Sequence, residues 1–270
     1  MAKTILITGA TDGIGLVTAM KLAKLGHDLI IHGRNSEKLA DAKKRIDAAG
    51  SGKVTPLMAD FSSLTQVSAM ADEIVKSGIK IDVLINNAGV FKTATPLTAQ
   101  GMDVRFIVNT IAPYLLTRKL LSVFNAQARV LNLSSAAQAS IDFEALQGQK
   151  QIDDMAAYAQ SKTAITMWTK TLSDQLEELV LVAINPGSLL ASKMVKQGFG
   201  VAGKDLTIGA DILVEMALSD TVSTHSGDYF DNDAGSFSTP HSDVLDDELC
   251  SELIEVMDKV MQKFINHCWR

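Results

Sequence analysis

The segment Tyr158-Ala159-Gln160-Ser161-Lys162 places a phenol and an ammonium group four residues apart. In a helix this spacing puts both side chains on one face. A free tyrosine has a pKa of about 10, and a neighbouring Lys⁺ favours the phenolate and lowers that value. The pair is therefore a candidate acid–base unit. The same spacing also occurs by chance on solvated helix faces, so the rest of the chain must decide between the two interpretations.

A glycine-rich turn near the start of the chain indicates a nucleotide site. It reads Gly9-Ala10-Thr11-Asp12-Gly13-Ile14-Gly15, after an apolar run and before a helical pattern. Glycines let the backbone approach a pyrophosphate, and the N-terminus of the following helix offers free N–H groups. The spacing is not G-x-G-x-x-G, because Thr18 stands at the third glycine position. A plain strand–helix turn is the alternative interpretation.

These groups must be positioned by the elements that the hydrophobic pattern predicts. Short apolar runs predict buried strands, with a further short edge strand at Gly227–Phe230; the runs are 3–8, 27–32, 54–59, 82–85, 129–133 and 180–184. Between and after them, helical patterns cover about 14–25, 36–49 with Ser36 as N-cap, 64–76, 101–124 bent at Pro113, the segment of Tyr158 to about 178, 206–218 and 246–265. Residues 136–153 are expected to be irregular or partly helical. The alternation predicts an α/β fold, a single doubly wound parallel sheet with helices on both faces, in one domain spanning residues 1–270.

The polar and glycine clusters follow the predicted strands. They are the glycine turn, Gly33-Arg34, Asp60, Asn86 to Gly89, Ser134-Ser135 and Pro186-Gly187. In open α/β sheets ligands bind beyond the carboxyl ends of the strands. We therefore expect these clusters to form one site.

Three of these motifs, in their order along the chain, resemble the short-chain dehydrogenase/reductase family. They are Thr8-Gly9-x-x-x-Gly13-x-Gly15, Asn86-Asn87-Ala88-Gly89 and Tyr158-x-x-Ser161-Lys162. The resemblance runs from Lys3 to about Met194. It implies a catalytic set of Asn109, Ser135, Tyr158 and Lys162, in which the second of the two adjacent serines is the functional one.

The resemblance also implies how these residues act in hydride transfer between a nicotinamide and a carbonyl or alcohol. Tyr158 donates or accepts the proton, and Ser135 hydrogen-bonds the reacting oxygen. Lys162 lowers the pKa of Tyr158 and binds the nicotinamide ribose, while Asn109 holds a water that links Lys162 to solvent.

The cofactor preference can be argued from the end of the second predicted strand. An NAD-binding site has a carboxylate about twenty residues after the glycine turn. Here that position is Gly33, followed by Arg34, and Asp28 is at the wrong end of the strand. A guanidinium suits a 2′-phosphate, so we expect NADP(H) to be preferred over NAD(H). Asp12 counts against this, because NADP-preferring relatives often have a basic residue there, and a solvated surface Arg34 is the alternative.

The resemblance implies further cofactor contacts. Asp60 with Phe61 resembles the adenine-binding acid, Asn87, Ala88 and Gly89 would line the adenosine, and Pro186-Gly187 would turn beside the nicotinamide. Ser192 stands near the place of a threonine that binds the carboxamide. The cofactor-binding residues expected in all are Gly9, Thr11, Asp12, Gly13, Ile14, Gly15, Arg34, Asp60, Phe61, Asn87, Ala88, Gly89, Tyr158, Lys162, Pro186, Gly187 and Ser192.

The substrate side points to a bulky apolar carbonyl or alcohol. Ser135 and Tyr158 are 23 positions apart, and this insert, like the Gly33-Arg34-Asn35 run, resembles the branch of retinol dehydrogenases and protochlorophyllide reductase. A loop at about 188–205 is expected to act as a mobile lid over the substrate, with an ordinary surface loop as the alternative. The segment at about 227–270 would close the pocket or a subunit interface.

Composition excludes several other classes of protein. The 270 residues carry a net charge of −6 and are 47% hydrophobic, which argues against nucleic-acid or anionic-membrane partners. We expect no signal peptide, no membrane span and no metal site, since the five histidines follow no ligand pattern. Cys250 and Cys268 are expected to be free thiols of a reducing cytoplasm. The resemblance implies a homodimer or homotetramer.

Two other functions share parts of this pattern. An extended-type epimerase or dehydratase has the Tyr-x-x-x-Lys pair, but with a G-x-x-G-x-x-G turn and a longer chain. A nucleotide-sensing regulator on the same fold usually loses Tyr or Lys, and this chain keeps both.

Overall fold

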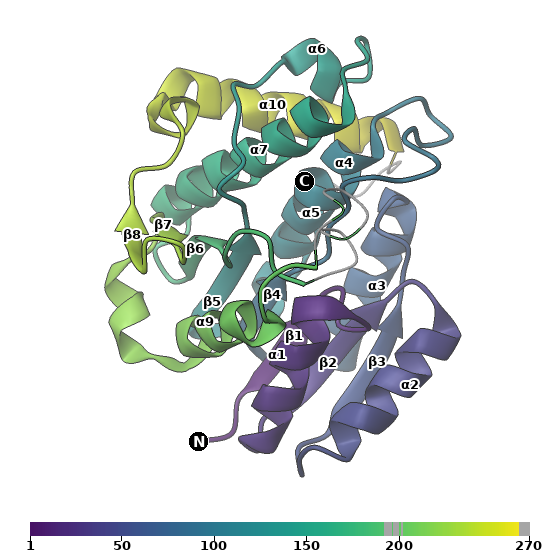
Figure 1. The fold of residues 1–270 in the computed structure, drawn as a ribbon, viewed down its shortest axis with the longest axis vertical. Coiled ribbons are helices and arrows are strands. Elements are labelled where there is room, and N and C mark those ends of the chain that lie inside the picture. The colour runs from purple at the N-terminus through teal and green to yellow at the C-terminus, as the bar shows by residue number, and fades with distance from the viewer. Residues whose placement is uncertain (192–195, 197–199, 201, 265–270) are drawn as a thin grey trace.

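The fold is built on one sheet in a computed structural model that describes residues 1–191, 196, 200 and 202–264. The strand order is β3-β2-β1-β4-β5-β6-β7-β8, and Figure 1 shows helices on both sides of the sheet. Strands β1 to β7 run parallel, and β8 is antiparallel to β7. The strands are β1 Thr4–Ile7, β2 Asp28–Gly33, β3 Val54–Met58, β4 Ile81–Asn86, β5 Phe124–Leu133, β6 Val180–Asn185, β7 Tyr229–Asp231 and β8 Ser236–Ser238. The predicted doubly wound α/β fold is confirmed.

The helices follow the strands in the alternation that the sequence predicts. The α-helices are α1 Gly13–Lys24, α2 Ser36–Asp47, α3 Leu64–Ser77, α4 Val104–Phe106, α5 Ala112–Lys119, α6 Phe143–Leu146, α7 Asp154–Gln175, α9 Leu206–Leu218 and α10 Asp247–Phe264. A π-helix, η1, covers Ile107–Ile111, and the 3₁₀ turns are η2 Leu121–Val123, η3 Asp220–Thr224 and η4 Ser242–Leu245. No helix within the described ranges combines the length and the apolar character that crossing a membrane requires.

Alternate side chains of each strand point to opposite faces of the sheet and build two apolar layers. Ile5 and Ile7 of β1 pack into the layer that includes α1, α2 and α9, while Leu6 between them packs into the layer with α3, α5, α7 and α10. Because both faces are covered, the strands are apolar throughout rather than alternating. The sheet is therefore a rigid base whose carboxyl edge carries the loops.

The predicted long helix at 101–124 is wrong in detail. It is divided into α4, the π-helix η1 and α5, with Pro113 in the first turn of α5. Proline has no N–H, so an α-helical bond to the carbonyl of Asn109 is impossible. The wider π turn that ends at Ala112, whose N–H bonds the carbonyl of Ile107, accommodates this loss. Such π segments often occur at functional sites.

Two smaller predictions also need correction. The expected edge strand at Gly227–Phe230 is β7, which lies between β6 and β8 and therefore has two neighbours. Ser36 is the first helical residue of α2 and not its N-cap. Asn35 is the cap, and its side chain accepts a hydrogen bond from the Lys38 N–H at 2.9 Å.

The order of the strands locates the crevice. From β1 the chain proceeds outward through β2 to β3 and then returns to β4 on the other side of β1. Loops after β1 and β4 therefore diverge at this point, where doubly wound sheets bind their ligands. The glycine turn follows β1, and Asn87 to Gly89 follow β4.

Candidate active site

Tyr158 and Lys162 share one face of α7. The helix begins at Asp154 and is capped by Asp153, whose carboxylate accepts hydrogen bonds from the Met155 and Ala156 N–H groups, both at 2.9 Å. The helix is buried from Ala159 to Thr169 and packs against β5 and β6, which fixes the position of the pair. The Lys162 Nζ lies 5.7 Å from the centre of the Tyr158 ring.

Lys162 is almost fully buried, with 5% of its surface exposed. Its Nζ donates a hydrogen bond to the Leu133 carbonyl oxygen, at the end of β5, at 2.6 Å. Burial lowers the pKa of Lys162 to about 8, because desolvation disfavours the charged form. The ammonium is thus held at the carboxyl edge of the sheet and is easier to deprotonate than a surface lysine.

In the chain by itself, burial determines the direction in which the pKa of Tyr158 is shifted. Burial raises the pKa of Tyr158, and a hydrogen bond with Ser135 opposes this effect without outweighing it. The expected lowering of this pKa by Lys162 remains a prediction. At neutral pH the phenol is protonated, which is the form that a proton donor requires.

The two adjacent serines face different surroundings. The Ser135 side chain is near enough to Tyr158 to oppose the rise of its pKa. Its hydroxyl oxygen accepts a bond from the Ala137 N–H, and its carbonyl oxygen accepts one from the Tyr229 hydroxyl, both at 3.1 Å. Ser134 is buried, and its hydroxyl contacts the Lys162 carbonyl oxygen at 3.0 Å and the Thr166 hydroxyl at 2.7 Å. Ser134 thereby fastens α7 to β5, whereas Ser135 stands beside the phenol.

The Asn109 side chain is committed to a backbone segment. Its Oδ1 accepts from the Val90 N–H at 2.8 Å, and its Nδ2 donates to the Val90 carbonyl at 3.0 Å and to the Ser161 hydroxyl at 2.9 Å. Ser161 in turn donates to the Tyr158 carbonyl at 2.6 Å. Asn109 therefore links the loop after β4 to the helix of Tyr158. Its predicted role in holding a water remains a prediction.

The glycine turn is tightly packed against the loop after β4. Gly9 and Gly13 have φ of +67° and +56°, a region that favours glycine. A Cβ on Gly15 would come within 2.4 Å of the Asn87 Nδ2. That nitrogen donates to the carbonyl oxygens of Thr8 and Gly9, and the Thr8 hydroxyl accepts from the Asn87 and Ala88 N–H groups at 3.0 Å. Asn87 and Ala88 thus hold the shape of the turn.

Asp12 has a structural role at this turn. It is the N-cap of α1, and its Oδ1 accepts from the Gly13 N–H at 2.9 Å. The carboxylate is exposed, and its cap bond explains why an acid stands at this position. The next N–H groups, those of Ile14 and Gly15, follow in the first turn of α1.

Arg34 is brought to the glycine turn by close packing of the residue before it. A Cβ on Gly33 would lie 2.3 Å from the Thr11 Cγ2, so the end of β2 touches the turn. Arg34 is exposed, and among the described residues its guanidinium has no hydrogen-bond or ion-pair partner. Its five donors therefore face solvent beside the turn.

The predicted adenine-side residues separate into one exposed and one buried group. Asp60 is partly exposed, and its Oδ1 accepts from the Ser62 N–H and hydroxyl at 2.9 and 2.8 Å. Phe61 is buried, and its ring stacks on His32 with centroids 4.3 Å apart. Asp60 is therefore accessible to a ligand, whereas Phe61 belongs to the core and packs on His32.

Pro186 and Gly187 turn the chain after β6. Gly187 has φ of +119°, and the Pro186 carbonyl accepts from the Asn232 Nδ2 at 2.9 Å. Asp233 holds the next residue, because its carboxylate accepts from the Ser188 N–H at 2.9 and 3.0 Å. Ser192 and part of the predicted lid, residues 192–195, 197–199 and 201, lie outside the described residues.

His32 is a residue at the site that the sequence did not single out. Its Nδ1 accepts from the Gly9 N–H at 3.2 Å, and its Nε2 contacts the Ala59 carbonyl at 2.9 Å. The ring thereby joins the glycine turn to the end of β3. Burial lowers the pKa of His32 to about 4, so it is neutral at pH 7 with the proton on Nε2. The only sequence signal that could have found it is the position of a histidine at the end of the predicted strand 27–32.

Comparison with known proteins adds the last observation. A sequence model of the short chain dehydrogenase family matches residues 3–199. The chain belongs to the short-chain dehydrogenase/reductase family. Like its relatives, this short-chain dehydrogenase/reductase is an NAD(P)-dependent enzyme, and the resemblance expected from its motifs is confirmed.

Similar proteins lie in the branch that the motifs predict. Retinol dehydrogenase 13 of Mus musculus is 34% identical over 251 residues, covering 85% of this chain and 75% of the relative. Among solved structures, an uncharacterised protein from Mycobacterium paratuberculosis has a TM-score of 0.80 at 25% identity and covers 96% of this chain and 93% of that one. A structure named as a short chain dehydrogenase from Shigella flexneri 2a complexed with NADP has a TM-score of 0.68 at 25% identity, covering 86% and 97%.

Proposed function

We propose that this dehydrogenase is an NADPH-dependent oxidoreductase that exchanges a hydride with a bulky apolar carbonyl or alcohol, with Tyr158 as the proton donor or acceptor. The proximity of the Tyr158 ring to the Lys162 Nζ, at 5.7 Å, and to Ser135 carries this proposal. A protonated phenol with a second hydroxyl beside it supports this role. A carbonyl oxygen that accepts from both would be polarised and then protonated.

The residues present fit a nicotinamide dinucleotide. The packed glycine turn and the start of α1 offer backbone N–H groups for a pyrophosphate, and Arg34 offers a free guanidinium beside them. A bound nicotinamide supplies or accepts the hydride. The dianionic 2′-phosphate of NADP(H) would complement Arg34, which supports the preference for that cofactor.

Each residue of the set has its own part in the proton chemistry. Lys162 carries a buried positive charge near the ring of Tyr158, and this charge favours the phenolate left behind by proton donation. Since the pKa of Lys162 is about 8, it remains mostly protonated at neutral pH. Ser135 orients the phenol and the substrate oxygen, and Asn109 fixes the neighbouring loop.

The test is Tyr158→Phe with Tyr114→Phe as its matched control. We expect Tyr158→Phe to abolish turnover while NADPH still binds, because only the proton is lost. Tyr114 is buried and bonded to Asp258 and Arg118, facing α10, so its replacement should leave turnover in place. Substrates for the assay come from a screen of aldehydes, ketones, quinones and hydroxysteroids, and retinol and its aldehyde are added because of the relative's name. The reaction is measured by the absorbance of NADPH. Normal kcat in Tyr158→Phe would refute the role of the phenol.

The remaining parts of the proposal concern the whole protein. We propose one domain, a substrate loop at about 188–205 and a homodimer or homotetramer, which light scattering in solution would test. The segment after β6 supports a closing role, since Asp243 Oδ2 accepts from the Ile141 N–H at 2.9 Å and Tyr229 bonds Ser135. A cytoplasmic location remains a prediction.

A further inference from the structure

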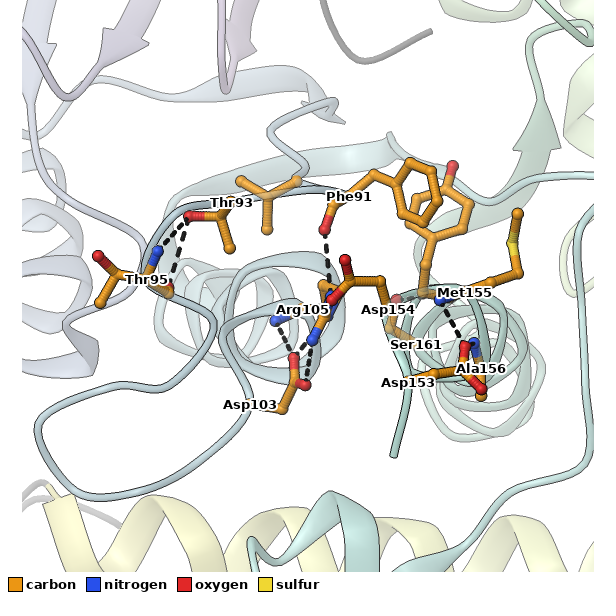
Figure 2. Close-up of polar contacts among 12 residues, drawn as sticks. Phe91, Thr93, Thr95, Asp103, Arg105, Asp153, Asp154, Met155, Ala156 and Ser161 are labelled. Atoms are coloured by element: carbon orange, nitrogen blue, oxygen red, sulfur yellow. Dashed lines mark hydrogen bonds and ion pairs between the residues drawn. The ribbon is translucent and has the colours of Figure 1, made fainter. Parts of the chain in front are cut away.

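Arg105 is a buried cation with partners on three segments. Only 1% of its surface is exposed. Its Nε and Nη2 bind the two carboxylate oxygens of Asp103 at 2.8 and 2.5 Å. Its Nη1 bonds the Asp154 carboxylate and the Phe91 carbonyl oxygen, the latter at 3.4 Å. Figure 2 shows the guanidinium between Asp103 on one side and Asp154 on the other.

The three partners belong to the segments that surround Tyr158. Asp103 is the N-cap of α4, which continues into the π-helix of Asn109. Phe91 follows β4, and its ring centre lies 5.0 Å from that of Tyr158. Asp154 is the first residue of α7, one turn before Tyr158. Arg105 is therefore the point where these three segments are joined.

Arg105 and Asn109 together fix the loop after β4 at two consecutive residues. Asn109 binds both the N–H and the carbonyl of Val90, and Arg105 binds the carbonyl of Phe91. Since the Phe91 ring packs on Tyr158 and is almost fully buried, a shift of this loop would move the wall against which the phenol rests.

The chemistry of the cluster favours a role in geometry. Removing charged groups from water is costly, so a buried ion pair often adds little net stability. A planar guanidinium with several partners does, however, fix their relative orientation, which a lysine ammonium cannot reproduce. A displacement of about 1 Å at a catalytic group can cost about 100-fold in rate.

We propose that Arg105 is a positioning residue for the reaction, holding Phe91 and the start of α7 so that the Tyr158 phenol stands at Ser135. This inference rests on the proposed function, because it assigns to Arg105 the placement of the proton donor. Arg105 acts through Phe91 and Asp154 and does not itself touch the reacting atoms.

The experiment uses Asp154, because replacement of the buried Arg105 risks unfolding. The Asp154 side chain is 49% exposed, so Asp154→Ala should fold. We expect its kcat to fall about 10- to 100-fold with the Kd for NADPH unchanged. Asp154→Asn keeps an oxygen that accepts from Arg105, and it should restore most of the kcat. Arg105→Lys, if it folds, should behave as Asp154→Ala.

Asp247→Ala is the matched control. Asp247 is also the first residue of a helix, α10, and it pairs with Lys170 of α7 at 2.8 Å, on a more distant turn. Its loss removes an equivalent charge and ion pair but should leave kcat unchanged. An equal fall of kcat in this control would overturn the proposal, as would wild-type kcat in Asp154→Ala.

A second readout separates this inference from the proposed function. The chain has three tyrosines, so ¹³Cζ-tyrosine labelling gives a small NMR spectrum in which Tyr158→Phe assigns the signal of Tyr158. We expect this signal to shift in Asp154→Ala, to return in Asp154→Asn and to stay in place in Asp247→Ala. If the wild type converts no carbonyl or alcohol, the proposed function fails. The NMR result then decides alone, and an unmoved Tyr158 signal in Asp154→Ala overturns the positioning role.

Discussion

The two sides of the crevice differ in how their polar groups are partnered. On the side of α7, the side chains of Lys162, Asn109 and Ser134 are buried and bonded to distant parts of the chain. On the side of β1 and β2, Arg34 is exposed and has no partner among the described residues. We call the side of α7 the closed side, because its polar groups are bonded within the protein, and the side of β1 and β2 the open side, because its guanidinium is exposed.

This difference corresponds to what each side must do. Proton transfer depends on fixed distances and on desolvation, so its groups gain from internal hydrogen bonds. Binding a phosphate depends on donors that the protein has not already used. Replacing a group on the closed side should therefore change kcat, and replacing one on the open side should change the affinity for the cofactor.

After Tyr158→Phe, Lys162→Met should have the largest effect on the closed side. Without the ammonium, the phenolate loses its stabilising charge, and kcat should fall by about 10²- to 10⁴-fold. Steady-state kinetics with NADPH and a carbonyl measure this loss. Lys170→Met is the control, because it removes the same charge from the same helix at a surface ion pair with Asp247.

A thermal melt of both variants completes that test. Lys162→Met removes a desolvated charge and should therefore melt near the wild type. If its kcat were also near the wild-type value, the buried ammonium would have no role in the proton chemistry, and the contrast between the two sides would lose its main support.

His32→Gln tests the buried ring that joins the glycine turn of the open side to the end of β3. Its folded pKa is about 4 against 6.5 for an ordinary histidine. Between these values the unfolded chain binds a proton that the folded chain excludes, so stability is complete above pH 6.5 and is lost as the pH falls toward 4. The shift corresponds to about 3 kcal/mol.

Chemical denaturation from pH 7 to pH 4 measures this loss. The wild-type free energy of unfolding should fall more steeply than that of His32→Gln, which cannot take up the proton. Parallel curves for the two proteins would show that protonation of His32 contributes nothing to the acid sensitivity of the fold.

Much of this architecture could be predicted from local signals. The order of strands and helices follows from apolar runs and caps, and the places where Ser135 and Arg34 lie follow from the rule that sites form at carboxyl ends. The division of the helix at 101–124 was missed, because a proline usually bends a helix and the sequence does not state how the lost bond is replaced.

Contacts between residues that are far apart in the sequence could not be predicted. Arg105 lies 49 positions from Asp154, and neither residue alone differs from an ordinary surface charge. The spacing of Tyr158 and Lys162 indicates that they are close, but not that both side chains are buried, which raises the pKa of the phenol and lowers that of the lysine. Burial decides both outcomes, and it becomes visible only when the layers are assembled.

Arg34→Ala should have the smallest effect of the three, confined to the cofactor. Loss of charge-assisted bonds to a 2′-phosphate, about 1.5–3 kcal/mol, should raise the KM for NADPH about 10- to 100-fold. The KM for NADH, which lacks that phosphate, should change little. Arg45→Ala is the control, since Arg45 is also exposed but lies in the last turn of α2, away from the glycine turn, and is paired with Asp41 at 3.8 Å. An equal rise of the KM for NADPH and NADH would show that Arg34 supports the fold of the turn and does not bind the 2′-phosphate. The exposed guanidinium of the open side would then need another explanation.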